Sequence, residues 1–169
     1  QTQDHPMFKT YAEELKWLTT DKVRMAWVAK TVKDVSTSGN TLVLVDRISA
    51  GEILQEQLEG SVFVSGSTKN VDRKEQYDEV STATNKIIIA TYGVASVGIN
   101  IPRIFNLVLI EPGKSFVRVI QSIGRGIRKA EDKENVQIWD ITSSCKFAKR
   151  HLGARKKFYK EANYPYTIE

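Results

Sequence analysis

The sequence predicts an α/β fold with an open, mostly parallel sheet of at least five strands, flanked by helices and carrying extra N-terminal and C-terminal helices. The first observation is a set of short apolar runs, typical of strands buried on both faces, at residues 42–45, 62–64, 87–90, 107–110 and 136–139. The second is that segments of helical or loop character separate these runs. Such alternation favours right-handed crossovers, and it places ligands at the carboxyl ends of the strands.

Two helices are expected before any strand. Within residues 7–18 and residues 22–36, apolar side chains recur near one helical face. We expect both helices to cover one side or edge of the sheet. Trp17 and Trp27 lie in these helices, and we interpret them as packing residues rather than as binding platforms.

Further helices are expected between the strands and after them. Ser49, with Glu52 three residues later, forms a capping box that predicts a helix after the first strand. Asn70 is expected to cap a polar helix that runs to about Val80. Other helical or looped segments are expected at residues 92–97, 115–129 and about 145–162.

Size and composition indicate one soluble globular domain over residues 1–169. Within it we expect the N-terminal helices, a core and a basic C-terminal helix, over residues 1–38, 41–140 and 141–169. We expect no membrane span and no secretion signal, because no apolar run approaches 18 residues and no basic-then-apolar leader opens the chain.

Cysteine and histidine usage predicts neither a disulfide nor a metal site. The single cysteine, Cys145, has no partner within the chain and suits a reducing, cytoplasmic compartment. His5 and His151 are distant in sequence, and we expect both at the surface rather than as metal ligands.

Positive charge is concentrated at the C-terminal end. Residues 141–169 carry seven Lys or Arg against two Glu, which matches the net charge of +5 of the whole chain. A local excess of this size favours a polyanion, usually nucleic acid, although a solvated helix face would have the same composition.

The segment from Gln121 to Lys129, QSIGRGIRK, has the features of a phosphate site. On a helix, Gln121, Arg125 and Arg128 project from one face, because they lie at i, i+4 and i+7. Each guanidinium can donate two hydrogen bonds to phosphate oxygens. Gly124 and Gly126 cost the helix roughly 1 kcal/mol each, which argues against a plain basic surface helix.

A second candidate is the loop after the third strand. Thr91 lies at the strand end, where its hydroxyl and nearby backbone N–H groups could contact a phosphate. Gly93 and Gly98 allow tight backbone conformations before Pro102. Without further context, a plain strand-to-helix connection explains these residues equally well.

The chain lacks the parts that hold a nucleotide and its metal ion. Gly113-Lys114-Ser115 has the setting of a P-loop, but Val108 stands where the motif needs a glycine. Asp140 ends a strand but is followed by Ile141 rather than by a second acid. These absences argue against a complete nucleotide-binding site within this chain.

Four segments, in the right order, resemble the superfamily 2 helicases. QSIGRGIRK resembles motif VI, ATYGVASVGINIP motif V and TLVLVDRISAGEILQEQL motif IV. FVSGSTKNVDRKE resembles the strand, turn and polar helix between motifs IV and V. The chain is therefore similar to the C-terminal RecA-like domain of this family, and its ending, WDITSSCKFAKRHLGARKKFYKEANYPY, resembles that of phage recombination and repair helicases.

The resemblance implies roles for particular residues. It implies that Arg128 is the arginine finger, that Arg125 contacts the terminal phosphate and that Gln121 adds a hydrogen bond. Thr91 would contact the nucleic-acid backbone. Gly98, Asn100 and Gly124 would line the nucleotide site, although Asn100 stands where many relatives carry Asp. ATP and Mg²⁺ would be held mainly by an N-terminal RecA-like domain of the same protein.

The C-terminal helix lies outside these motifs. We expect Arg155, Lys156 and Lys157 to lie along duplex or branched DNA. The aromatic residues of this helix, Phe147, Phe158 and Tyr159, are expected mostly to pack.

The leading hypothesis is the second motor domain of an ATP-dependent DNA or RNA helicase that acts in recombination, repair or branch migration. We expect the isolated chain to be inactive, and we expect a cytoplasmic location, in the host if the protein is phage-encoded. Two alternatives stay open: a non-catalytic nucleic-acid-binding domain with this fold, or the motor half of a restriction or remodelling enzyme.

Overall fold

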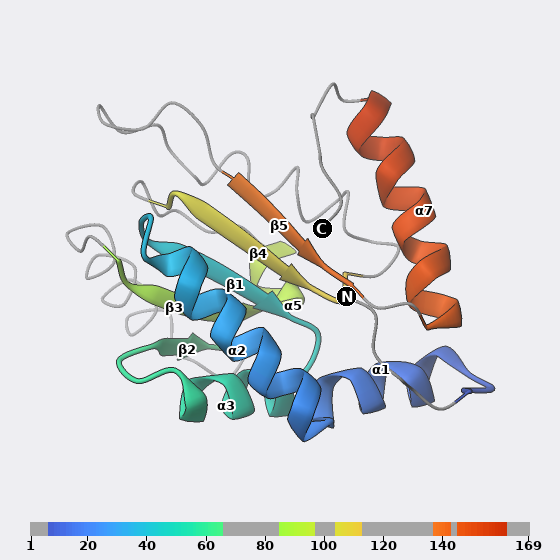
Figure 1. The fold of residues 1–169 in the computed structure, drawn as a ribbon, viewed down its shortest axis with the longest axis horizontal. Coiled ribbons are helices and arrows are strands. Elements are labelled where there is room, and N and C mark those ends of the chain that lie inside the picture. Colours follow the sequence, from blue (N-terminus) through green and yellow to red (C-terminus); the bar gives the residue numbers. More distant parts are fainter. Residues whose placement is uncertain (1–6, 66–84, 97–103, 113–136, 143–144, 162–169) are drawn as a thin grey trace.

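A computed structural model describes residues 7–65, 85–96, 104–112, 137–142 and 145–161. Its centre is a five-stranded parallel sheet with the strand order β2-β3-β1-β4-β5 (Figure 1). The strands are β1 Thr41–Val45, β2 Val62–Val64, β3 Ile87–Thr91, β4 Asn106–Ile110 and β5 Gln137–Ile141. The predicted fold class and all five strand positions are confirmed, and β5 continues to Ile141.

Five helices accompany this sheet within the described ranges. They are α1 Tyr11–Thr20, α2 Lys22–Ser36, α3 Ile48–Gln57, α5 Tyr92–Ser96 and α7 Lys146–Glu161. In Figure 1, α2 and α3 lie on one face of the sheet, α5 lies on the other, and α7 lies beside the β5 edge. The helices predicted over residues 70–80 and 115–129 fall outside the described residues.

The helix starts follow from capping side chains, with one difference from the sequence prediction. Thr10 Oγ1 accepts the Glu13 N–H at the start of α1, and an Asp21 carboxylate oxygen accepts the Arg24 N–H at the start of α2. The capping box at Ser49 is wrong, because α3 already begins at Ile48 and has no side-chain cap.

The main core lies between the sheet and the helices α2 and α3. It joins Met25, Val28, Val32 and Leu54 to one face of the sheet. The partly buried Trp27 packs against this core. Trp17 packs against a smaller cluster that contains Leu18 and Cys145. Both tryptophans are packing residues, as predicted. β1 is buried along its whole length, as expected for the central strand of a parallel sheet.

At the amino-terminal edge of the sheet, asparagine side-chain amides hydrogen-bond to neighbouring segments. The Asn106 side-chain amide donates to Val35 O at 3.2 Å and to Ser38 Oγ at 3.0 Å. Asn40 Oδ1 accepts the Lys86 N–H at 2.7 Å. These bonds hold the chain between α2 and β1 against the starts of β3 and β4.

Candidate functional site

All five strands are parallel, so their carboxyl ends lie along one edge of the sheet. Thr91 is the last residue of β3 and lies at this edge. Its hydroxyl oxygen accepts the Val94 N–H at 3.3 Å and so caps the short helix α5, and among the described residues no acceptor takes its O–H proton. Thr91 is partly exposed and therefore accessible to a ligand.

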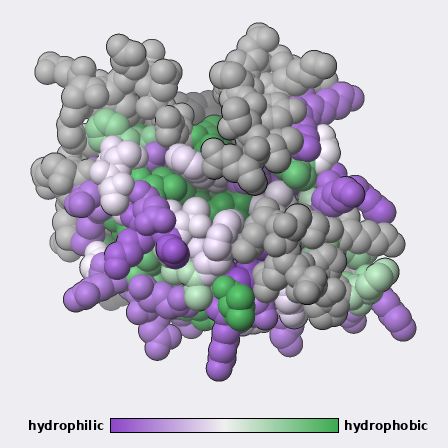
Figure 2. Space-filling view, in the orientation of Figure 1, coloured by the Kyte–Doolittle hydropathy of each residue, from purple (hydrophilic) through white to green (hydrophobic). Residues whose placement is uncertain are grey.

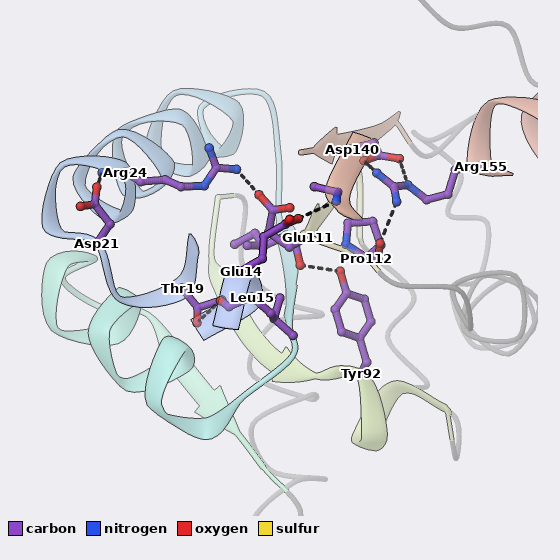
Figure 3. A network of polar contacts seen from close by, with 12 residues as sticks. Glu14, Leu15, Thr19, Asp21, Arg24, Tyr92, Glu111, Pro112, Asp140 and Arg155 are labelled. Carbon is purple, nitrogen blue, oxygen red and sulfur yellow. Dashed lines mark hydrogen bonds and ion pairs between the residues drawn. The ribbon is translucent and has the colours of Figure 1, made fainter. Parts of the chain in front are cut away.

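Tyr92 ties α5 to the neighbouring part of the same edge. Its hydroxyl donates to the Ile110 carbonyl at 2.9 Å (Figure 3). Burial raises the pKa of the Tyr92 hydroxyl well above its usual value, and the Asp140 carboxylate raises it further. Tyr92 therefore stays a neutral hydrogen-bond donor, and it fixes the segment after β3 against the end of β4.

Glu111 follows β4 directly and is buried with Arg24 from α2. Its carboxylate accepts a hydrogen bond from Arg24 Nη2, and its backbone N–H donates to Ile141 O at 2.9 Å. Glu111 has φ +47°, a left-handed conformation that non-glycine residues rarely adopt. Burial raises the pKa of the Glu111 carboxyl to about 7, although the Arg24 guanidinium opposes that shift.

Arg155 makes the second buried ion pair at this edge. Its Nε and Nη2 donate to the two Asp140 carboxylate oxygens at 2.6 and 2.9 Å, and its Nη1 donates to Pro112 O at 2.7 Å. The guanidinium therefore joins α7 to the ends of β4 and β5 (Figure 3). This corrects the prediction for Arg155: its side chain is 1% exposed and bonded within the domain, so it is not available to a nucleic acid.

The start of α7 is held by a carboxylate from the other end of the chain. Glu14, from α1, accepts the N–H of Phe147 at 2.9 Å and the N–H of Ala148 at 2.6 Å. A negative charge at this position also matches the partial positive charge of a helix N-terminus.

His151 lies next to this contact and is buried, which corrects its predicted place at the surface. Its ring contacts that of Tyr11, with centroids 4.7 Å apart. A hollow of about 10 Å³, room for roughly one water molecule, is lined by both rings together with Glu14 and Glu111.

Most predicted site residues fall outside the described part of the chain. These are the proposed catalytic residues Gln121, Arg125 and Arg128 and the proposed nucleotide-site residues Gly98, Asn100 and Gly124. Of the predicted nucleic-acid contacts, Lys157 is exposed and Lys156 is half-buried on α7.

Sequence reasoning did not identify Glu14, Arg24 or Glu111 as parts of this edge.

Among the described residues, no group of three or more His, Cys, Asp or Glu side chains could hold a metal ion. The described helices are also too short or too polar to cross a membrane.

The family described as "Helicase conserved C-terminal domain" matches residues 23–130. The chain is 30% identical over 161 residues to the ATP-dependent DNA helicase uvsW of Enterobacteria phage T4, covering 92% of this chain and 32% of the relative. It is 33% identical over 104 residues to putative helicase 22 of a Sulfolobus islandicus filamentous virus, covering 59% and 18%. The chain thus spans a third or less of the length of these two relatives.

Solved structures show the same fold. T4 UvsW superimposes with a TM-score of 0.78 at 23% identity, over 90% of this chain and 35% of that one. The C-terminal domain of the DEAD-box protein Dbp5 superimposes with a TM-score of 0.65 at 19% identity, over 83% and 81%. The family match covers more than half of the chain, including the motif V and motif VI segments. The chain therefore belongs to the helicase conserved C-terminal domain family.

Proposed function

We propose that the chain is the second motor domain of an ATP-dependent superfamily 2 helicase that acts on DNA in recombination, repair or branch migration. The observation that carries this proposal is the family match over residues 23–130, which includes Thr91 and the segment from Gln121 to Arg128. The parallel sheet supports it, because its carboxyl edge presents Thr91 where open α/β sheets bind their ligands.

In this proposal the chain supplies cations to a nucleotide that another domain holds. Arg128 is the arginine finger, Arg125 contacts the terminal phosphate and Gln121 donates a hydrogen bond. Charge develops on the transferred phosphoryl group, so cations placed beforehand in a dry site lower the barrier. An arginine finger is typically worth about 10³–10⁵ in rate.

ATP and Mg²⁺ are held mainly by an N-terminal RecA-like domain of the same protein. This chain lacks a P-loop, because Val108, where the motif needs a glycine, lies within β4. The isolated chain therefore has no ATPase activity of its own. Gly98, Asn100 and Gly124 line its side of the cleft between the two domains. Hydrolysis follows closure of that cleft, and this couples it to domain movement.

Thr91 contributes to the nucleic-acid track, with Lys156 and Lys157 as further contacts. The Thr91 hydroxyl oxygen accepts from the Val94 N–H, so in this proposal it is the hydroxyl proton that donates to a backbone phosphate. The similarity to a phage DNA helicase favours DNA over RNA as the substrate.

The test uses the protein that joins this chain to a P-loop motor domain. Arg128→Ala should lower DNA-stimulated ATP hydrolysis by about 10³-fold or more, with the midpoint of thermal unfolding unchanged. Lys30→Ala, at an exposed cation on α2, is the matched control and should leave the rate unchanged. A rate that survives Arg128→Ala would reject the motor role and leave a non-catalytic nucleic-acid-binding domain.

A further inference from the structure

Helix α7 has two faces of different chemistry, and its anchors fix which face is outside. The inward face carries Ala148, His151 and Arg155, all buried, and Cys145 just before the helix is buried as well. The contacts of Glu14 with the first turn, and of Arg155 with Asp140 and Pro112, leave the helix little freedom to rotate.

The outward face carries cations. Lys149, Arg150 and Lys157 are exposed and Lys156 is half-buried. Hydrophilic side chains project along the edge of the molecule where α7 lies (Figure 2; compare Figure 1).

These four cations surround a single glycine. Lys149 and Arg150 precede Gly153 by four and three residues, and Lys156 and Lys157 follow it by three and four. Residues three and four apart are neighbours on a helix surface, so Gly153 lies in the middle of the group. We call these five residues the Gly153 surface.

The fold itself does not need this glycine. A Cβ at Gly153 would meet no atom within 4 Å, so neither a close approach nor a crowded core requires its absence. Glycine inside a helix costs roughly 1 kcal/mol relative to alanine. The position therefore loses stability without gaining anything in the packing of this domain.

The charges are likewise unexplained by the domain's own contacts. No ion pair joins any of the four cations to a carboxylate in the part of the chain that the structure describes. Arg150 contacts the Phe147 ring at 5.7 Å, which places its guanidinium over the helix rather than against an acid. Four like charges near one another repel, and a polyanion would relieve that repulsion.

We propose that the Gly153 surface binds the phosphate backbone of a nucleic acid, with the missing side chain letting the backbone approach the helix closely. Lys149 to Lys157 spans about 12 Å at 1.5 Å per residue. At one charge per 3.4 Å along a strand, that length faces roughly three or four phosphates. The proposal rests on the proposed function, because it takes nucleic acid as the polyanion. It assigns the contact to Lys149 and Arg150 instead of to the buried Arg155.

The first test removes charge. The probe is a fluorescent DNA duplex, and its affinity for the protein with both motor domains is measured by anisotropy at several salt concentrations, without nucleotide. Lys149→Ala with Lys157→Ala should weaken binding several-fold and reduce the salt slope by about 1.8, for two lost phosphate contacts. Lys30→Ala with Lys33→Ala removes the same charge from the exposed side of α2 and should change neither quantity.

The second test changes shape and keeps charge. Gly153→Leu should weaken binding several-fold, whereas Ala26→Leu, at an exposed alanine of α2, should leave it unchanged. Circular dichroism should show the same helix content in both variants as in the unaltered protein. Equal affinities for the two leucine variants would overturn the close approach at Gly153.

The outcomes separate this inference from the proposed function. If the unaltered protein binds no DNA, the proposed function fails. If it binds DNA and neither the paired lysine variant nor Gly153→Leu weakens binding, the proposed function stands and the Gly153 surface is overturned.

Discussion

Two buried arginine–carboxylate pairs lie at the same edge of the sheet and differ in how each carboxylate is held. Arg155 binds both oxygens of Asp140 and a carbonyl, and Asp140 keeps 13% of its side-chain surface exposed. Arg24 meets Glu111, whose side chain is 3% exposed and whose backbone is left-handed. The strength of the first pair is set mainly by its hydrogen-bond geometry. The strength of the second is set mainly by the cost of removing its carboxylate from water. Two buried arginine–carboxylate pairs at one edge can therefore contribute differently to stability.

The largest expected effect comes from breaking the first pair. Arg155→Ala should lower the free energy of unfolding by about 3–5 kcal/mol, because it leaves the Asp140 carboxylate and the Pro112 carbonyl without their shared donor. Urea denaturation measures this change. Lys156→Ala, at the next residue, is the control and should stay within about 0.5 kcal/mol of the unaltered protein.

The second pair should be easier to break, because Glu111 can take up a proton. Arg24→Met should cost roughly 1–3 kcal/mol at pH 6, where the Glu111 carboxyl lies below its pKa of about 7 and is already mostly protonated. At pH 8 the cost should be larger, since the carboxyl must then ionise without a cation or stay protonated above its pKa. Urea denaturation at the two pH values makes the comparison, and equal losses would contradict this account.

The Glu111 carboxyl should also give the unaltered protein a distinct pH dependence. Its pKa is raised from 4.5 to about 7 on folding, so between these values the unfolded chain loses a proton that the folded chain keeps. Stability from this group is thus fully present below pH 4.5 and falls as the pH rises to about 7. Glu111→Gln should remove that part of the slope, which thermal unfolding across this range would measure.

The smallest effect concerns a third buried carboxylate, which binds backbone N–H groups instead of a guanidinium. Glu14→Gln keeps one acceptor for the start of α7 and loses the other, so it should cost about 1 kcal/mol. Glu13→Gln, on the exposed side of α1, should cost almost nothing. If Glu14→Gln lowered the free energy of unfolding as much as Arg155→Ala, the loss of charge alone would determine the size of the effect at this edge.

The sequence predicts the sheet well because its signal is local. Apolar runs such as Leu42–Val45 and Leu107–Ile110 need no partner to be recognised as buried strands. The same holds for α2, whose predicted bounds match the observed helix. The capping box at Ser49 failed because α3 begins two residues earlier than that cap implies, with Arg47 at the N-cap position and Ser49 already inside the helix.

The polar edge was missed because its contacts join distant parts of the chain. Arg24 and Glu111 are 87 residues apart, and Glu14 is more than 130 residues from the start of α7. A signal did exist for two residues. Arg155 follows Ala148 and His151 at helical spacing, and Arg24 precedes Val28 by four residues, so both lie on inward faces. Reading them as basic residues alone placed Arg155 in solvent.

The amides at the opposite edge of the sheet have a consequence for how the domain opens. Asn40 and Asn106 carry no titratable proton, so their bonds do not weaken as acidity changes, whereas Glu111 at the other end does respond. Deuterium uptake in mildly alkaline buffer should accordingly rise first around the ends of β4 and β5, while the turns leading into β1 and β4 stay protected. The sheet would then open first at the carboxyl ends of its strands.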